Sequence, residues 1–535
     1  MKLDPKKLQA DTAAGFPRFF QDKRILFCVV ITFLWGLAAH GYCFLNTGFS
    51  HDSLNAFYAA ESEELWKLEL GRFFVPAYRQ LFRGPIALPW LIGLISLTFL
   101  SAAVYLVTDL LEVQTKPLMI LISGVMVTNI TIIAQAATYL YELDFNCLSI
   151  FLAVLAVWLW KRQNSVLSFL LGSLCVLISM GIYQAYFSTA VTLMILVSLM
   201  DLFQGEDVKK VFFRGLQAIA MLLCGGILYF AAGKIIYAVM GITGQSRTDV
   251  FNFDGIENPL QFFVRLAIRT YYNFADRLHH SAYPQGIQVM ITIMEVLLVL
   301  SLIWGLISMK KKEPVRFLLI FLLIGVLPFA MNVTYFLAKG INVHELMIYS
   351  VWFVWVIFPV FIDRCCIRLP SLKGLAKGVS CLLVFVLLWQ NVLLANTAYM
   401  KKDIEAQYTM STMTRVLSLI EQHEDYVYGE TPVAFMGTDN AYGTMPGFES
   451  VSTIIGMYDN TSVNVDYSNY YFNVFKAYFH YVLNYPLVFC DDETHYILRS
   501  SQEVEDMPAF PEKDCIQMID GVLVVKLGYK NYLDS

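Results

Sequence analysis

Long apolar stretches alternate with short polar ones between residues 25 and 400 of this 535-residue chain. A helix needs about 20 predominantly apolar residues to cross a bilayer. Eleven stretches reach or approach that length. They cover residues 25–45, 85–109, 117–137, a fourth stretch that ends at Lys161 and Arg162, 165–182, 186–204, 215–240, 286–309, 316–336, 346–362 and 378–398. The pattern predicts an all-α polytopic membrane protein with about eleven transmembrane helices.

Clusters of basic residues all fall on one side of the predicted spans. Lys and Arg are enriched in cytoplasmic loops, so the clusters indicate which ends of the helices lie inside. The clusters fall in residues 1–24, 161–162, 209–214, 310–312 and 364–377. We therefore expect the segment 1–24 to be cytoplasmic, and the odd number of spans places residues 400–535 outside. The first span is long enough to be a signal anchor that stays in the membrane.

Two long segments fall on the predicted outer side, residues 46–84 and 241–285. The first has helical periodicity, which predicts a helix lying in the headgroup region. Its apolar face carries Leu54, Phe57, Tyr58, Leu65 and Leu68, and its polar face carries Glu63, Glu64 and Lys67. In the second segment, Asn258-Pro259 is typical of a helix start. Downstream of it, Arg265, Arg269, Tyr272 and Asp276 share one helical face.

Residues 400–535 are richer in charge, and their apolar runs are shorter. We expect a helix over Met413–Ile420, a strand over Pro432–Met436, a helix over Asn473–Leu483, and extended chain over Pro486–Phe489 and Cys515–Leu527 with a turn at Asp520-Gly521. These elements predict a small extracytoplasmic α/β domain after the transmembrane region 25–399. Cys490 and Cys515 either form a disulfide there or remain free thiols.

The composition supports a membrane protein and excludes several other classes. The chain is 57% hydrophobic and 15% charged, whereas soluble domains are about 25% charged. No basic tract indicates a nucleic-acid partner, and the ten cysteines show neither C-x-x-C nor zinc spacing. Nucleotide-binding, zinc-protease and hydrolase motifs are absent, as is the D-x-D pair by which many nucleotide-sugar enzymes hold a metal.

Polar residues of the kinds that perform chemistry gather on the predicted outer side. Polar groups near a bilayer are costly, so they tend to be functional or paired. The candidates are Asp52, with His51 beside it, Arg72, Glu142, Asp144, Tyr183, Gln184, Arg265, Arg269, Lys339, His344 and Glu345. A carboxylate, a cation and an interfacial helix at one face suggest chemistry on a lipid-linked substrate. The alternatives are solvated turns for Glu142 and Asp144, a salt-bridged surface helix for Arg265 and Arg269, and an interfacial belt for the aromatic residues.

Four short motifs carry a resemblance to a known family. They are His51-Asp-Ser-Leu54, Gly71-Arg-Phe-Phe74, Tyr141-Glu-Leu-Asp144 and Gly181-Ile-Tyr-Gln-Ala-Tyr-Phe-Ser188. Over residues 25–400 the chain resembles the bacterial type II O-antigen (serotype-converting) glucosyltransferases, which belong to the multi-pass C-type glycosyltransferase superfamily. Residues 400–535 carry no such resemblance.

The resemblance implies a polyprenyl-phosphate-sugar donor, undecaprenyl-phosphate-glucose in the first instance, and a cell-envelope glycan as acceptor. It places the protein in the bacterial cytoplasmic membrane among membrane lipids, with a donor-synthesising enzyme and a flippase as partners. Enzymes of this superfamily carry an acidic residue in the first outer loop, the position of Asp52. Asp52 would be the general base of an inverting displacement, with Glu142 or Asp144 in reserve.

The same resemblance assigns roles to the other polar residues. Cations should offset the charge of the phosphate leaving group, and Arg72, Arg265, Arg269 and Lys339 are the candidates. Such a leaving group requires no metal, so no cofactor is expected. The sugar or acceptor would contact His51, Tyr58, Tyr183, Gln184, Tyr272 and His344.

Two other functions stay open from the sequence. A transporter or flippase of lipid-linked sugars would place polar residues inside the spans and show a pseudo-repeat, and neither is clear. A polymerase or ligase of envelope glycans would use a lipid pyrophosphate donor. The basic residues Arg265, Arg269 and Arg277 with His279 and His280 are compatible with it.

Overall fold

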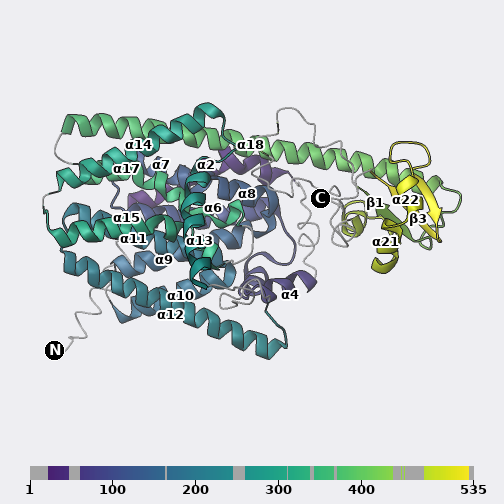
Figure 1. Cartoon of the computed structure of the whole chain (residues 1–535), viewed down its shortest axis with the longest axis horizontal. Coiled ribbons are helices and arrows are strands. Elements are labelled where there is room, and N and C mark those ends of the chain that lie inside the picture. The colour runs from purple at the N-terminus through teal and green to yellow at the C-terminus, as the bar shows by residue number, and fades with distance from the viewer. Residues whose placement is uncertain are drawn as a thin grey trace.

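The structure is a computed structural model. It describes residues 22–46, 61–162, 165–244, 259–309, 311–337, 343–366, 370–437, 448, 451 and 475–528. Figure 1 shows a bundle of long helices lying along one axis, with a small domain beyond one end of the bundle.

The bundle is built from twelve helices of the described residues, which lie roughly parallel to one another (Figure 1). They are α2 (Lys23–Leu45), α6 (Pro89–Leu110), α7 (Lys116–Thr128), α8 (Ile130–Thr138), α9 (Leu143–Arg162), α10 (Val166–Ile182), α11 (Phe187–Gln204), α12 (Val208–Met240), α14 (Gln285–Ser308), α15 (Pro314–Met331), α17 (Phe353–Cys365) and α18 (Pro370–Gln422). Nine helical stretches in the described part of the chain are long and apolar enough to cross a membrane. The prediction of an all-α polytopic membrane protein is confirmed.

Each expected span coincides with helix, but three depart from a single full-length helix. α10 has 17 residues. α17 has 13 and is preceded by the short helical turns η5 (Glu345–Met347) and η6 (Tyr349–Trp352). The third span is divided into α7 and α8 at Asn129, whose side chain accepts from the backbone N–H of Ile132 and so starts the second helix.

Burial in the bundle is graded from centre to edge. α7, α8 and α9 are almost wholly buried, whereas α12, α14 and α15 expose large apolar side chains. Exposed examples are Leu223, Ile227, Ile235, Val296, Ile303, Leu318 and Phe321. An apolar outer surface of this kind suits contact with lipid rather than with water.

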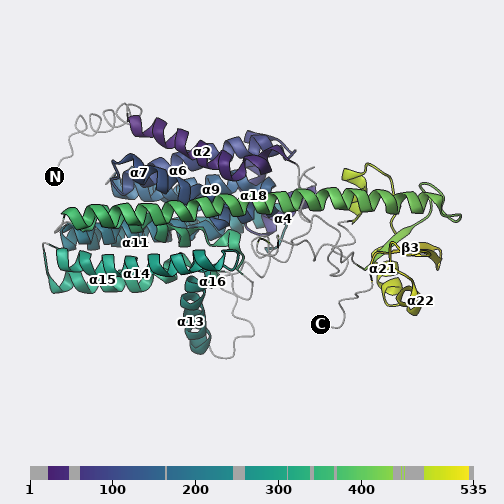
Figure 2. The same cartoon turned by 90° about the horizontal axis from the view of Figure 1, so that it is seen from above.

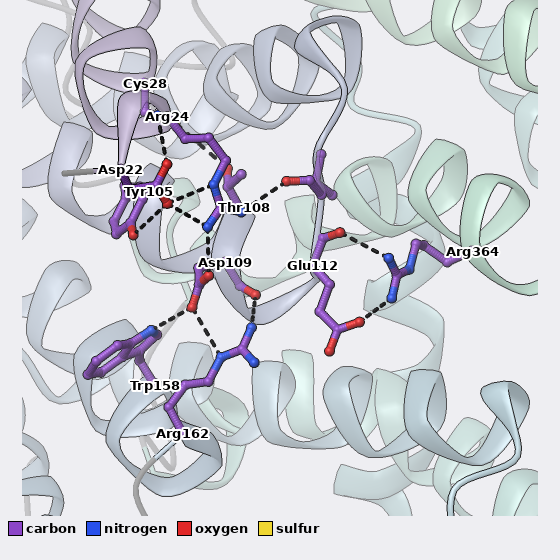
Figure 3. A network of polar contacts seen from close by, with 11 residues as sticks. Asp22, Arg24, Cys28, Tyr105, Thr108, Asp109, Glu112, Trp158, Arg162 and Arg364 are labelled. Atoms are coloured by element: carbon purple, nitrogen blue, oxygen red, sulfur yellow. Dashed lines mark hydrogen bonds and ion pairs between the residues drawn. The ribbon is translucent and has the colours of Figure 1, made fainter. Parts of the chain in front are cut away.

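Ion pairs join the helices at the end of the bundle where the predicted cytoplasmic clusters lie, called here the basic end. Asp109 of α6 accepts from Arg24 Nη2 at 3.0 Å, Trp158 Nε1 at 3.0 Å and Arg162 Nε at 3.1 Å (Figure 3). Nearby, Arg364 of α17 pairs with Glu112 (Figure 3). The network ties α2, α6, α9 and α17 together and leaves the opposite end to carry other polar groups.

Short helices cover the opposite end, called here the site end. They are α4 (Glu61–Glu69), α5 (Val75–Tyr78), η1 (Arg79–Arg83), η2 (Leu140–Glu142), η3 (Gln184–Tyr186) and α16 (Thr334–Leu337). α13 (Pro259–Leu278) is amphipathic and stands out from the bundle across the direction of α14 and α15 (Figure 2). The described parts of both long loops therefore form helices, as predicted; their place at a membrane interface stays a prediction.

α18 continues well past the bundle and carries the C-terminal domain (Figures 1 and 2). It has 53 residues, so it runs through residue 400 and contains the expected Met413–Ile420 helix without a break. Beyond it, β1 (Val433–Met436) pairs in parallel with β3 (Val522–Lys526), which pairs antiparallel with β2 (Ile516–Ile519). Helices η9 (Tyr478–Val482), α21 (Asp492–Arg499) and α22 (Gln502–Asp506) complete the predicted α/β domain. Cys490 and Cys515 are free thiols.

Candidate functional site

α4 is turned so that its basic residue faces the bundle. Lys67 is 4% exposed, lies 2.8 Å from Glu63 Oε1 and forms an ion pair with Glu142, whereas Leu65 and Trp66 are exposed. The prediction that Glu63 and Lys67 share a solvated face opposite Leu65 is therefore wrong. The pattern of α4 alone does not reveal its orientation, because the partner carboxylate Glu142 lies on a different helix.

Two carboxylates mark the start of α9, and both are buried. Arg72 Nη1 lies 3.2 and 3.3 Å from the two carboxylate oxygens of Glu142, which also pairs with Lys67. Asp144 accepts from Arg83 Nη1 at 3.1 Å and from Tyr78 Oη at 3.0 Å. The alternative of a solvated turn is excluded for both residues, and each has a buried cation as its partner.

The turn between α4 and α5 brings two of the motifs together. Gly71 adopts a positive φ of 74°, a conformation that favours glycine. Gln184 Nε2 donates to Leu70 O at 2.7 Å and to Tyr229 Oη at 2.8 Å. The guanidinium of Arg72 lies over the Tyr183 ring, 4.5 Å from its centroid. Gly71-Arg-Phe-Phe74 is thus held against the Gly181–Ser188 motif.

Arg79 and Arg83 follow on η1, and both are buried, Arg79 near Glu63 and Arg83 against Asp144. Arg79 is 1% exposed, and its Nη2 lies 3.8 Å from Glu63 Oε1. None of its three guanidinium nitrogens has a hydrogen-bond partner among the described residues. The same is true of Arg83 Nε and Nη2 and of Arg72 Nε. Buried N–H groups without partners are costly and uncommon, so this cluster has donors to offer to a ligand.

We call Lys67, Arg72, Arg79 and Arg83 the cation cluster. The cluster has a net positive charge. These four cations face three carboxylates among the described residues, those of Glu63, Glu142 and Asp144. Burial lowers the pKa of Arg83, although Asp144 opposes the shift. Burial would also lower the pKa of Arg72, but Glu142 beside it holds that pKa above its usual value. The arrangement suits an anionic group.

Comparison with known families decides what this site belongs to. The model of the glucosyl transferase GtrII family matches residues 41–360, more than half of the chain. The chain belongs to the GtrII glucosyl transferase family. The resemblance expected from the four motifs is confirmed, and the protein is a glucosyltransferase. No curated protein and no solved structure matches the chain.

The GtrII match includes the entire cation cluster and ends before α18 and the C-terminal domain. Of the residues expected at the site of this glucosyltransferase, the structure brings together Arg72, Glu142, Asp144, Tyr183 and Gln184. His51, Asp52, Tyr58 and Lys339 lie outside the described residues. Their expected roles stay predictions.

Three expected residues lie elsewhere, on α13. Arg265, Arg269 and Tyr272 are exposed, and Figure 2 shows α13 standing away from the bundle. Arg269 lies over the Tyr335 ring at 5.8 Å. Helical spacing correctly placed them on one face, but the structure gives them no contact with the cation cluster among the described residues.

His344 belongs to a second polar group near η5. Arg277 pairs with Glu345, and His280 Nε2 lies 3.5 Å from Glu345 Oε1. Burial, with Arg277 contributing, lowers the pKa of His344. His344 is half-buried there, apart from the residues that pair with Glu142.

Lys67, Arg79, Arg83 and Asn146 lie at the site although the sequence does not single them out as site residues. Asn146 lies one helical turn after Glu142, is 1% exposed, and has no partner for either amide atom among the described residues. The sequence does contain a feature that points to the two arginines of η1. Arg79 and Arg83 are four residues apart and precede a span on the side where the positive-inside rule expects few cations.

Proposed function

We propose that this glucosyltransferase takes glucose from a polyprenyl-phosphate donor and passes it to a cell-envelope glycan. The observation that carries the proposal is the cation cluster with its unpaired, buried N–H groups. A polyprenyl-phosphate-sugar is a phosphodiester with one negative charge, which matches an excess of one cation. A pyrophosphate donor, as a polymerase or ligase would use, brings more negative charge than the described residues balance.

Arg79 is the first candidate for the donor phosphate, with Arg72 and Arg83 beside it. A guanidinium presents planar N–H groups that suit phosphate oxygens, and such charge-assisted bonds are strong. In the transfer, an acceptor hydroxyl attacks the anomeric carbon, the bond from that carbon to the phosphate oxygen breaks, and polyprenyl phosphate leaves. The cations would stabilise the charge that develops on the leaving phosphate.

Asp52 is the proposed general base, which takes the proton of the acceptor hydroxyl. The ion pairs of Glu142 and Asp144 support this choice, because both carboxylates are already engaged by buried cations. We propose that Glu142 and Asp144 position the arginines. Tyr183 Oη and the amide of Asn146 have no partners among the described residues and suit sugar hydroxyls.

Gln184 has a different proposed role from sugar binding. Its amide nitrogen is already bonded to Leu70 O and Tyr229 Oη, so it holds the turn that carries Arg72. His51 and Tyr58 remain proposed sugar contacts, and Lys339 a proposed phosphate contact, on the strength of the sequence alone.

The test is glucosyl transfer by the purified protein in nanodiscs with an envelope glycan as acceptor. Undecaprenyl-phosphate-glucose, undecaprenyl-pyrophosphate-glucose and UDP-glucose are compared as donors. We expect transfer from the first donor and a loss of roughly 100-fold or more in kcat for Asp52→Asn. Asp276→Asn, on the exposed face of α13, is the control and should match wild type.

Three results contradict the proposal. Transfer from UDP-glucose or from the pyrophosphate donor alone would assign another donor. Movement of the lipid across the bilayer without transfer would favour the transporter hypothesis. Wild-type kcat in Asp52→Asn would exclude Asp52 as the base.

A further inference from the structure

A cavity of about 300 Å³ lies within the bundle between α11, α13, α14, α15 and α17. Its walls are apolar side chains throughout, except for one carboxylate, Glu295 of α14. Glu295 is held by His279, whose Nε2 lies 3.0 Å from Glu295 Oε2. A cavity of this size and lining accepts hydrocarbon, and it offers a sugar or nucleotide too few hydrogen-bond partners.

The cavity lies at the depth of the membrane spans, and α13 forms part of its wall. Phe274 and Leu278 at the end of α13 line it together with Leu327 and Met331 of α15. α13 crosses the direction of α14 and α15 as an amphipathic helix (Figure 2). A helix of this type lies at the boundary between headgroups and acyl chains, so the cavity extends from that boundary into the hydrocarbon region.

Side-chain contacts connect the cavity to the cation cluster. Met331, in the cavity wall, accepts through its carbonyl from Ser350 Oγ at 2.6 Å, and Ser350 Oγ lies 3.0 Å from Ser188 Oγ.

Ser188 stands in the first turn of α11, directly after η3. Within η3, the rings of Tyr186 and Tyr183 lie 5.2 Å apart, and Tyr183 lies under Arg72. These contacts join the elements that carry the cation cluster to those that line the cavity, through η3, α11 and η6.

We propose that this cavity binds part of the isoprenoid chain of the lipid-phosphate donor. The identity of the occupant rests on the proposed function, since a donor whose phosphate is held at the cation cluster needs apolar surroundings for its chain, and the cavity provides them. Glu295 excludes the opposite arrangement, because an acidic wall repels phosphate. The cavity thus takes the chain, and the cluster takes the headgroup.

The test compares two substitutions at neighbouring positions of α15. Leu327→Trp fills the cavity, whereas Val326→Trp places the same side chain on the exposed face of the helix. The probe is undecaprenyl phosphate with a photoreactive diazirine in its chain, added to protein in nanodiscs with and without excess phosphatidylglycerol. Crosslinked peptides are mapped by mass spectrometry, and KM is measured for undecaprenyl and geranyl donors.

We expect crosslinks on α14, α15 or α17 in wild type and in Val326→Trp, and their loss in Leu327→Trp. Leu327→Trp should raise KM for the undecaprenyl donor at least about ten-fold and leave KM for the geranyl donor unchanged. Crosslinks confined to other helices would overturn the inference. Equal displacement by phosphatidylglycerol would overturn it too, because the cavity would then be a general lipid site. Cavity crosslinks without any glucosyl transfer would support the inference and refute the proposed function.

Discussion

Burial of paired charges is the main feature of the site at the scale of single residues. The buried carboxylate of Glu142 pairs with both Lys67 and Arg72, so that each cation depends on it for compensation of its charge. Removing one partner of a buried pair leaves an uncompensated charge, which costs far more than the loss of a surface pair. Each substitution here should therefore affect folding as well as the proposed binding of the donor.

Glu142→Gln should lower the free energy of unfolding by about 3–5 kcal/mol, because Lys67 and Arg72 lose their shared carboxylate. Chemical denaturation in detergent measures the effect. Glu64→Gln on α4 is the matched control, since no ion pair of Glu64 is found among the described residues, and it should lose less than about 1 kcal/mol. Equal losses in both variants would show that the Glu142 pairs add nothing specific.

His280 makes stability depend on pH. Burial, with Arg277 adding to it, lowers the pKa of His280 to about 4, and its Nδ1 accepts from the backbone N–H of Ala282. An unfolded histidine has a pKa of about 6.5, so the unfolded chain binds more protons between these values. The stabilisation is complete above pH 6.5 and is lost as the pH falls towards 4, up to about 3 kcal/mol.

Unfolding free energies at pH 7 and pH 4.5 test this dependence. His280→Asn keeps an acceptor for Ala282 but cannot titrate, so its loss on acidification should be smaller than that of wild type. His423→Asn, at the end of α18, should keep the wild-type dependence. An unchanged dependence in His280→Asn would contradict the assignment.

At the scale of elements, the turn between α4 and α5 decides where the cations lie. Gly71 and Gly84 both have positive φ, 74° and 76°, and so frame the segment that contains Arg72, Arg79 and Arg83. Their surroundings differ. A Cβ at Gly71 would overlap Tyr229 Oη and lie 3.0 Å from Gln184 Nε2, whereas a Cβ at Gly84 meets nothing within 4 Å.

Gly71→Ala should therefore displace Arg72 and reduce glucosyl transfer roughly 100-fold, since small shifts of positioning groups have effects of that size. Gly84→Ala should cost only backbone strain, about 1–3 kcal/mol of stability, with transfer close to wild type. The rates of glucosyl transfer of the two variants are compared at a temperature at which both are folded. Equal activity of the two variants would mean that close packing at Gly71 does not matter.

The sequence predicted elements well where one local pattern determines them. The spans follow from apolar runs, and the hairpin at Asp520-Gly521 follows from its turn residues. The continuity of α18 also had a local signal, because residues 379–422 contain neither Gly nor Pro. The change in composition near residue 400 obscured it.

The arrangement of the site could be predicted only in part. The motifs around Arg72, Glu142 and Tyr183 indicated the right elements, yet nothing local orients Lys67 towards Glu142 or buries Arg79. Those positions depend on contacts between residues far apart in the sequence. The exposed position of Arg265 on α13 is a tertiary property for the same reason.

At the scale of the whole molecule, polarity is divided between two ends. The basic end carries the Asp109 network (Figure 3), and the site end carries the cation cluster. The C-terminal domain lies beyond the site end, at the far end of α18 (Figure 1). The described start of α2 lies at the end of the bundle opposite the C-terminal domain (Figure 2). A chain that crosses a membrane an odd number of times has its two ends on opposite sides, which agrees with this arrangement.

Cysteine labelling in intact cells tests which end faces outward. Tyr496→Cys, exposed in the C-terminal domain, should react with a membrane-impermeant maleimide. Lys210→Cys, exposed at the basic end, should react only after permeabilisation. The ten native cysteines are buried or half-buried, so background labelling should be low. The reverse pattern would invert the proposed orientation.

Binding of undecaprenyl phosphate tests the central claim, that the buried cation cluster binds the donor phosphate, without requiring an acceptor. Dissociation constants are measured in nanodiscs for wild type, Arg79→Gln and Arg265→Gln, the last being the exposed arginine of α13. Loss of one charge-assisted phosphate contact of about 1.5–3 kcal/mol should weaken binding by Arg79→Gln roughly 10-fold to 100-fold. Arg265→Gln should bind as wild type does. Wild-type affinity in Arg79→Gln, or an equal loss in Arg265→Gln, would contradict the claim.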